Sequence, residues 1–435
     1  MINIPLEANE LIKLLQNNGH SAYVVGGCVR DSILNRKPND WDICTSATPD
    51  EMLNIFKDYK VIETGLRHGT ITVVNNGMFE ITTYRIDGKY TDNRRPDNVT
   101  FTNNLIEDLK RRDFTINAIA YNDTEGLIDP FDGVNDINNK IIKCVGNAKD
   151  RFEEDALRIL RAIRFASQLN FKIDDDTNTE INNQYKKLKN ISIERINNEF
   201  CKILYNANIW NDYLNVLTLI IPRFKNCIGF EQGKSHPYDV WNHTLKTISN
   251  CSNDIIIRLA ALFHDIGKPD VCFEDGDGRH FHGHAKISAQ HTEVIMKNMR
   301  FDNNTIKKVV SLVKHHDIVF EESSVFVKRW LSILGKEQFK RLIELRKADI
   351  LGQDPDRFER RLEKVYNVKK ITDEIINNDE CYSLKQLAIN GNDLIKLGYE
   401  DKKIGEMLNT LLNIVIDDNY LNNKESLLNI INNLK

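Results

Sequence analysis

Signals for β-strands are confined to the first third of this 435-residue chain, which limits the folds open to it. The apolar segment 23–25 is typical of a short strand, and the segments 71–74 and 78–84 flank an Asn76-Gly77 turn, the pattern of a β-hairpin. From about residue 148 onward the strand signals fade, and helical periodicity continues to the C-terminus. The pattern predicts an α+β protein in which a small mixed-sheet head is followed by an elongated all-α body.

The composition indicates the cellular environment of the protein and says less about its binding partners. The formal charge is −4, so only a local basic face would bind a polyanion. There is no apolar run of about 18 residues and no basic-then-apolar N-terminus, so we expect neither a membrane span nor a signal peptide. The eight cysteines contain no CxxC pair and are expected to be reduced thiols. We predict a cytoplasmic protein without membrane contact and leave its oligomeric state open.

Asp40 and Asp42 form the first candidate site. The segment 40–44 resembles a strand, on which side chains two positions apart share a face. Two adjacent carboxylates repel each other unless a cation lies between them, and hard oxygen ligands suit Mg²⁺. Glu80, on a strand of the predicted hairpin, is a candidate third carboxylate. Taken alone, such a pair is more often a surface turn than a metal site.

The residues just before this pair favour the metal site. Gly26-Gly27 follows the strand 23–25 and opens a helix, so the backbone can approach phosphates closely, with Arg30 beside it. A glycine turn, an arginine and two carboxylates in this order suit a nucleoside triphosphate and its metal ions. The head is therefore predicted to catalyse metal-dependent phosphoryl transfer, with the three carboxylates as catalytic residues.

A strong helix predicted over 150–169 carries a second polar pair. Asp155 and Arg158 share a face of this helix at i, i+3, and a salt bridge within the helix is the plainer interpretation. The functional interpretation is base selection. Cytosine and adenine both offer an exocyclic amine beside a ring-nitrogen acceptor, and guanine and uracil offer the reverse order. An Asp/Arg pair would accept C and A and reject G and U without a template.

Five segments follow one another along the chain: GGCVRD (26–31), DWD (40–42), RRDFTINA (111–118), EDALRILRAIRF (154–165) and 192–196 with Glu199. Together they resemble the successive motifs of class II tRNA nucleotidyltransferases, a group that also includes bacterial poly(A) polymerases. The resemblance implies addition of CCA to tRNA 3′ ends from CTP and ATP, with Mg²⁺ held by Asp40 and Asp42. It assigns nucleotide binding to Gly27, Arg30, Arg112, Asp155, Arg158, Arg161 and Arg164.

Arg164 differs from the other residues in this assignment. Nine residues of ideal helix turn through about 900°, which would face Arg164 away from Asp155. Contact with the RNA backbone or packing in the neck is the alternative role for this arginine.

The resemblance leaves the extent of addition open. Enzymes that add only CC lack a flexible loop between the carboxylate motif and RRD, whereas the segment 85–96 is intact and polar here. We therefore expect competence to add A, which leaves an A-adding-only tRNA enzyme as one alternative. A poly(A) polymerase is another, although such enzymes usually carry strongly basic extensions.

Histidines cluster in the helical body, where positions 243, 264, 282, 284, 291, 315 and 316 account for most of the 11 in the chain. The set His243, His264-Asp265 and Asp349 resembles the HD phosphohydrolase superfamily. That resemblance implies a divalent metal of open identity bound by His243, His264, Asp265 and Asp349, with phosphodiesterase or phosphatase activity. His284 and His315 are candidates for a second metal. A degenerate HD fold that only packs against tRNA is the plainer alternative.

The predicted domains are a nucleotidyltransferase head at 1–147, a helical neck for base and RNA binding at 148–225, an HD metal-binding domain at 226–355 and a helical tail at 356–435. The predicted function is template-independent CCA addition by two-metal nucleotidyl transfer, with an HD phosphohydrolase attached. The alternative from another class is an HD phosphohydrolase with an inactive RNA-binding head. The intact carboxylates and arginines of the head argue against that alternative.

Overall fold

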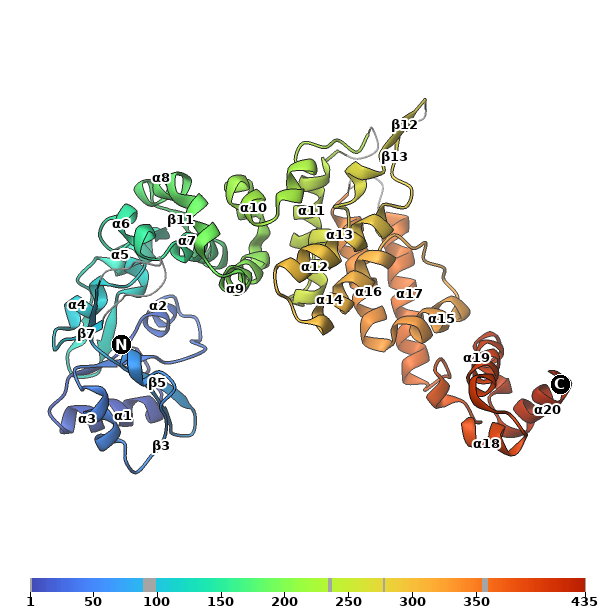
Figure 1. Ribbon diagram of the computed structural model, residues 1–435, viewed down its shortest axis with the longest axis horizontal. Coiled ribbons are helices and arrows are strands. Elements are labelled where there is room, and N and C mark those ends of the chain that lie inside the picture. Colours follow the sequence, from blue (N-terminus) through green and yellow to red (C-terminus); the bar gives the residue numbers. More distant parts are fainter. Residues whose placement is uncertain (1, 89–98, 234–236, 277, 354–358, 435) are drawn as a thin grey trace. The chain divides into compact units, whose positions relative to one another are not determined.

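The computed structural model describes residues 2–88, 99–233, 237–276, 278–353 and 359–434. It divides into two compact units, Met1–Ile220 and Ile221–Lys435, each described by itself below. The first unit contains a mixed sheet with helices, and the second is almost entirely helical (Figure 1). The predicted α+β class, with a mixed-sheet head and a helical body, is therefore confirmed. No helix among the described residues is long and apolar enough to span a membrane.

The first unit is built on a seven-stranded sheet in the order β3-β4-β5-β2-β1-β8-β9. Strands β2 and β5 are parallel and the other neighbours antiparallel, so the sheet is mixed. The strands are β1 Ala22–Val25, β2 Ile43–Thr45, β3 Lys60–Ile62, β4 Thr70–Val74, β5 Met78–Thr83, β8 Ala120–Asn122 and β9 Gly126–Ile128. Two smaller pairs are β6 Arg85–Asp87 with β7 Val99–Phe101, and β10 Ile141–Ile142 with β11 Lys172–Ile173.

Helices surround this sheet and continue into the neck. They are α1 Leu6–Asn17, α2 Gly27–Ile33, α3 Pro49–Ile55, α4 Leu105–Lys110, α5 Gly133–Asn139, α6 Ala148–Glu154, α7 Leu157–Leu169, α8 Asp175–Gln184, α9 Ile193–Ile203 and α10 Leu214–Ile220. The stripe Leu11, Ile12 and Leu15 of α1 is buried against the sheet. The predicted hairpin is confirmed as β4 and β5, with Asn76 at φ 48° in the turn.

Two predicted elements of the first unit differ in the structure. The strand expected at 40–44 begins only at Ile43, so Asp40 and Asp42 lie in the extended segment that leads into β2. The helix expected over 150–169 breaks at Asp155, where φ is −140° and ψ is 102°. The break is stabilised because the Asp155 carboxylate accepts a hydrogen bond from Leu157 N, at 3.0 Å, and so caps α7. Asp155 and Arg158 therefore do not share a helix face.

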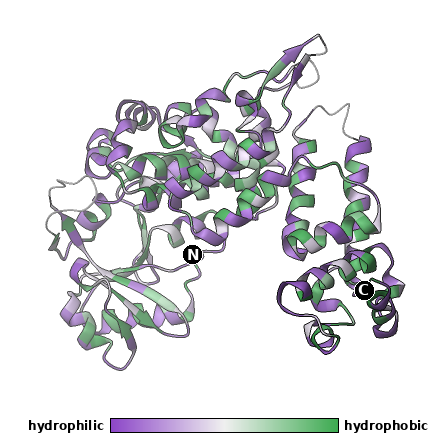
Figure 2. Cartoon of the chain, turned by 45° about the vertical axis from the view of Figure 1, so that its right-hand side comes forward, coloured by the Kyte–Doolittle hydropathy of each residue, from purple (hydrophilic) through white to green (hydrophobic). Residues whose placement is uncertain are grey.

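The second unit is a helical array, with α11 Val240–Ser249, α12 Ile255–Phe263, α13 His284–Asn298, α14 Asn303–His315, α15 Ser324–Leu334, α16 Lys336–Leu351 and α17 Glu359–Asn377. The short hairpin of β12 Phe273–Asp275 and β13 Gly278–His280 departs from the predicted all-α pattern. Apolar residues follow one face of these helices in Figure 2. The last helices, α18 Gly391–Lys396, α19 Asp401–Asp417 and α20 Lys424–Leu434, share a core that includes Leu411, Val415 and Ile431.

Candidate nucleotide and metal sites

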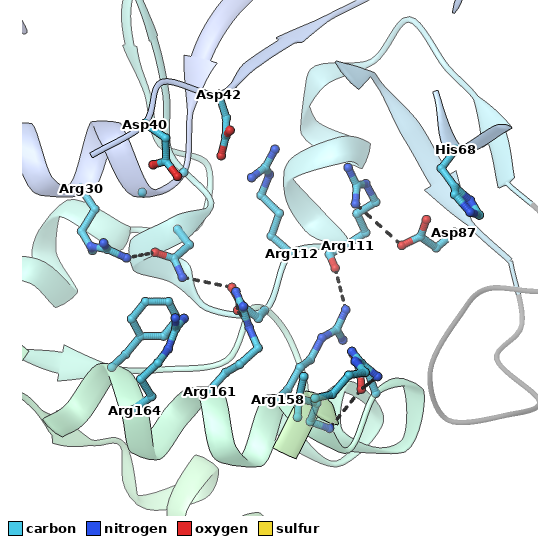
Figure 3. A pocket seen from close by; sticks show the side chains of 18 of the residues that line it. Arg30, Asp40, Asp42, His68, Asp87, Arg111, Arg112, Arg158, Arg161 and Arg164 are labelled. Carbon is cyan, nitrogen blue, oxygen red and sulfur yellow. Dashed lines mark hydrogen bonds and ion pairs between the residues drawn. The ribbon is translucent and has the colours of Figure 1, made fainter. Parts of the chain in front are cut away.

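One cavity of about 710 Å³ in the first unit brings together most of the predicted nucleotide site (Figure 3). Nine predicted residues line it: Gly27, Arg30, Asp40, Asp42, Arg112, Asp155, Arg158, Arg161 and Arg164. Figure 3 shows Asp40 and Asp42 on one side of the cavity and Arg158, Arg161 and Arg164 rising from α7 on the opposite side. Acidic and basic groups thus face each other across a space large enough for a nucleotide.

The acidic side of the cavity has the properties of a cation site. In the parallel pairing of β2 and β5, Ile43 lies opposite Ile81. Asp42, just before β2, is therefore level with Glu80, the third residue of β5. Burial, Asp40 and Glu80 together raise the pKa of Asp42 to about 6, although Arg112 opposes them. Glu80 is exposed and does not line the cavity itself. A buried carboxylate whose pKa is raised by neighbouring carboxylates is stabilised in its ionised form by a divalent cation.

The glycine turn at Gly26 leaves room for the side chain of Arg112 in the cavity. Gly26 has φ 83°, a conformation that favours glycine, and a Cβ there would lie 3.2 Å from Arg112 Nη1. Arg30, on α2, donates through Nη1 to Asn117 Oδ1 at 2.6 Å. The turn that the sequence singled out therefore lets the guanidinium of Arg112 pass close to the backbone.

Asp113 and Asn117 organise the arginines, although neither was among the site residues predicted from the sequence. Asn117 donates to Asp113 Oδ1 at 3.1 Å, and Arg161 donates to Asp113 Oδ2 at 2.7 Å. Burial alone would raise the pKa of Asp113, but Arg161, the Asn117 hydrogen bond and Arg158 lower it to about 2. The result is a continuous chain from Arg30 through Asn117 and Asp113 to Arg161. Both residues lie within the RRDFTINA motif, where polar residues placed among apolar ones were the available signal. The structure buries both.

Phe165 is a shared platform for three arginines. The guanidinium carbons of Arg164, Arg30 and Arg161 lie 4.1, 5.0 and 5.5 Å from its ring centroid. The expectation that Arg164 faces away from Asp155 assumed one continuous helix, whereas α7 starts only at Leu157. Arg164 lines the cavity together with Arg161 and Asp155. Arg164 also makes a neck contact, since its Nε lies 2.9 Å from a Glu199 carboxylate oxygen on α9.

The proposed base-reading pair has different partners from those expected. Asp155 pairs with Arg195 Nη2 at 2.7 Å, and Arg158 pairs with Glu154 at 2.5 Å. Arg158 Nη2 also donates to the Arg111 carbonyl at 3.0 Å. Arg195 belongs to the 192–196 motif run and lines the same cavity, but its role was not identified from the sequence. Each member of the pair is therefore held in place by a second residue.

The loop expected between the carboxylate motif and RRD lies partly outside the described residues, at 89–98. Its described flanks are β6 and β7, which pair antiparallel. Arg111, directly after α4, forms an ion pair with Asp108 of that helix, with Nη2 2.8 Å from Oδ1. Its Nη1 also lies 3.9 Å from Asp87 Oδ2 on β6. The described flanks of the loop are thus tied to the wall of the cavity.

The second unit gathers all four residues of the predicted HD metal site. The Nε2 atoms of His243 and His264 are 3.1 Å apart. His243 Nε2 lies 3.1 Å from Asp349, and His264 Nε2 lies 3.1 Å from Asp265. Burial alone would raise the pKa of the Asp265 carboxyl, but His264 and Lys268 hold it well below its usual range. Three of these residues, His243, His264 and Asp349, have ligand atoms within 4.8 Å of one another, a donor set that fits a divalent ion.

His316, not His315, extends this cluster, which corrects the sequence prediction. His284 Nε2 lies 3.2 Å from His316 Nε2. His315 instead packs edge-on against Trp330, with ring centroids 5.1 Å apart. The physical reason is helical geometry, since consecutive residues at the end of α14 point about 100° apart and only one can face the cluster.

Comparison with known families defines the class of the protein. Residues 22–143 match the model described as the Poly A polymerase head domain. Residues 170–213 match a probable RNA and SrmB- binding site of polymerase A, and residues 280–431 match tRNA nucleotidyltransferase domain 2. These matches, with the fold and the cavity, place the chain among the nucleotidyltransferases.

Comparison with individual relatives identifies the family within this class. The chain is 33% identical over 432 residues to a CCA-adding enzyme of Pediococcus pentosaceus, covering 99% of this chain and 98% of that protein. It is 42% identical over 266 residues to a CCA-adding enzyme of Oceanobacillus iheyensis, covering 61% and 64% of the two chains. The solved structure of the Bacillus stearothermophilus CCA-adding enzyme in complex with CTP matches with a TM-score of 0.71 at 29% identity, covering 97% and 96%. This chain belongs to the CCA-adding enzymes, the class II tRNA nucleotidyltransferases, and the predicted family is confirmed.

Proposed function

We propose that this chain completes tRNA 3′ ends by adding C, C and A from CTP and ATP without a nucleic acid template. The observation that carries the proposal is the single cavity in which two carboxylates face the arginines of α7. The full-length similarity to a CCA-adding enzyme supports it, as does the CTP bound to the Bacillus stearothermophilus relative.

In this proposal Asp40 and Asp42 would hold Mg²⁺, with Glu80 adding negative charge beside them. Bound there, the metal would neutralise the triphosphate and favour the ionised form of the attacking tRNA hydroxyl. The Asn117–Asp113 chain fixes the guanidiniums of Arg30 and Arg161. In this proposal both guanidiniums are thereby held in position to bind phosphate oxygens. Arg112 provides a further cation beside the glycine turn.

In this proposal Asp155 and Arg158 select the base. The Asp155 carboxylate accepts a hydrogen bond from the base, and the Arg158 guanidinium donates one to it. Arg195 uses two nitrogens on Asp155, at 2.7 and 3.4 Å, which orients the carboxylate and leaves lone pairs for an exocyclic amine. Glu154 and the Arg111 carbonyl orient Arg158 in the same way. This arrangement reads one edge of the base and does not require a template.

The function is tested by incorporation of labelled CTP and ATP into three tRNA substrates, ending before the first C, after C and after CC. A full CCA enzyme extends all three and then stops. Extension of the third substrate alone would support the A-adding-only alternative, and long A tracts would support a poly(A) polymerase. No incorporation into any of them would favour the remaining alternative, a phosphohydrolase with an inactive head.

Substitution of Asp155 tests the base-reading role. Asp155→Ala should reduce discrimination against GTP and UTP by roughly 10- to 100-fold, since a well-formed base contact contributes about 1–3 kcal/mol. Arg195→Ala should give part of the same loss, because the carboxylate is then no longer oriented. Glu153→Ala is the matched control, as this nearby carboxylate pairs only with the surface Lys187 among its described contacts. Unchanged selectivity in Asp155→Ala would refute the role.

We also propose that the second unit is a metal-dependent phosphohydrolase, and the convergence of His243, His264, Asp265 and Asp349 favours it. A divalent ion held there would lower the pKa of a bound water and so supply a nucleophile for phosphoester hydrolysis. Lys268, 2.6 Å from Asp265, and Arg346, 2.9 Å from Asp349, line the adjoining cavity and offer cations for a phosphate group. The identity of the metal and of the substrate is left to experiment.

His264→Ala should lower hydrolysis of bis(p-nitrophenyl) phosphate about 100-fold or more, because a metal ligand is removed. CCA addition should stay within about twofold of the unsubstituted chain, since the substitution lies in the other unit. His291→Ala is the control, a histidine paired with Asp270 away from the cluster. Undiminished phosphodiesterase turnover in His264→Ala would argue against this site.

A cytoplasmic location remains part of the proposal. All eight cysteines are free thiols, and most are buried. Thiols in this state are typical of proteins from reducing compartments.

A further inference from the structure

Asp108 is a buried carboxylate beside the nucleotide cavity that the proposed mechanism does not use. It lies near the end of α4 and is 0% exposed. Its Oδ1 accepts hydrogen bonds from Arg85 N at 3.2 Å and Arg111 Nε at 2.9 Å, and its Oδ2 accepts from Arg112 Nη2 at 3.4 Å. Burial alone would raise the pKa of Asp108, but Arg111 and Arg112 lower it. Two arginines that line the cavity therefore hold this carboxylate in its charged form.

Arg112 depends on Asp108 for its position. Among the described residues Asp108 is the one hydrogen-bond partner of its guanidinium, and its buried Nε has none. Figure 3 shows this guanidinium directed towards Asp42. Burial alone would lower the pKa of Arg112, but Asp108 and, more weakly, Asp42 raise it. Without Asp108 the guanidinium would pair with Asp42, the other carboxylate that attracts it.

Arg111 connects Asp108 to the opposite side of the cavity. Two of its nitrogens, Nε and Nη2, lie 2.9 and 2.8 Å from Asp108 Oδ1. Its backbone carbonyl accepts a hydrogen bond from Arg158 Nη2 at 3.0 Å. The ion pair that fixes Arg111 therefore also fixes an acceptor that orients Arg158.

We propose that Asp108 is a positioning residue for both sides of the nucleotide cavity. Through Arg112 it leaves Asp42 free to bind a metal ion. Through Arg111 it orients Arg158 towards the base. The proposal rests on the roles proposed above for Asp42 and Arg158.

A purely structural role for Asp108 explains less. Fixing the start of β6 through Arg85 N would not require a charge, since a neutral amide oxygen also accepts that hydrogen bond. The charge instead lies between the guanidiniums of Arg111 and Arg112, which both line the cavity.

Binding of CTP and GTP in the absence of divalent ions, measured by isothermal titration calorimetry, tests the base side. Asp108→Asn keeps an acceptor for Arg85 N but removes the charge, and it should lower the preference for CTP over GTP about tenfold. Arg111→Gln should give a similar loss. Glu107→Gln is the matched control and should keep the preference, because this neighbour on α4 pairs with the exposed Lys110 among its described contacts.

Thermal melting without divalent ions tests the metal side. In the unsubstituted chain Asp42→Asn should raise the melting temperature, because burial and the neighbouring carboxylates disfavour the charge of Asp42. In the Asp108→Asn chain the same substitution should give no rise, because Arg112 then pairs with the Asp42 carboxylate. A general loss of stability in Asp108→Asn would not remove this difference.

The outcomes separate this inference from the roles on which it rests. An unchanged CTP preference in both Asp108→Asn and Arg111→Gln, or an equal rise in melting temperature in both backgrounds, would overturn the positioning role alone. Equal affinity of the unsubstituted chain for CTP and GTP would overturn the base-reading proposal and the base side of this inference together. If Asp108→Asn does not fold, Arg111→Gln decides the base side, and an unchanged preference in it would overturn the inference.

Discussion

Asp42→Ala should lower kcat for CTP and ATP incorporation about 1,000-fold or more, because it removes a ligand of the proposed Mg²⁺. Burial beside Asp40 and Glu80 raises the pKa of Asp42 to about 6, and a bound divalent cation would offset the cost of keeping this carboxylate charged. Incorporation should also fall as the pH drops below about 6, where a proton competes with the metal for Asp42. Single-turnover incorporation into a tRNA ending in CC measures both effects.

Stability measurements separate this loss from misfolding. A raised carboxyl pKa means that the folded state disfavours the charge at pH values above it, so Asp42→Asn should melt at a higher temperature than the unsubstituted chain when no divalent ion is present. Asp58→Asn, at an exposed position of the head, should change neither activity nor melting. An Asp42→Asn protein that melts lower without metal, or Asp42→Ala with near-normal kcat, would contradict the assignment.

Local patterns in the sequence were sufficient to predict the architecture. Alternating apolar residues around Asn76-Gly77 specified the β4–β5 hairpin, because Asn and Gly favour the tight turn of a short loop, here the three residues 75–77. The stripe of α1 likewise specified which face is buried. The break at Asp155 was missed because helical periodicity continues through it, and a side chain that caps α7 overrides that local preference.

The candidate site was predictable where chemistry is repeated within a short segment. Asp40 and Asp42 could be predicted as metal ligands because they lie close together in the sequence. The same holds for His264 and Asp265. The partner of Asp155 did not, because Arg195 is 40 residues away and the contact depends on how α9 packs against α7. His316 could not be distinguished from His315 without the rotation of α14, which packing against α12, α13 and α16 fixes.

Asp113 should be the most important buried charge of the head, and its replacement gives the largest expected loss of stability. Removing one partner of a fully buried ion pair costs about 3–5 kcal/mol, and here the loss should be about 2–3 kcal/mol because a third of the Arg161 side chain is exposed. Asp113→Ala should also raise KM for CTP and ATP about tenfold, since Arg161 and, through Asn117, Arg30 are no longer held in place. Urea unfolding and steady-state kinetics measure the two effects.

The pH dependence of the free energy of unfolding tests whether the loss of stability in Asp113 variants comes from the ion pair. The pKa of Asp113 lies at about 2, below its ordinary 3.8, so its contribution to the free energy of unfolding is fully present above about pH 4 and disappears as the pH falls through 2. The stability difference between the unsubstituted chain and Asp113→Asn should therefore shrink over that interval. Asp136 is the matched control, a buried carboxyl whose pKa burial raises and whose hydroxyl partner Thr115 carries no charge. Asp136→Asn should not reproduce the acid-dependent loss. A stability difference that stays constant from pH 7 to pH 2 would show that Asp113 acts through packing and not through its charge.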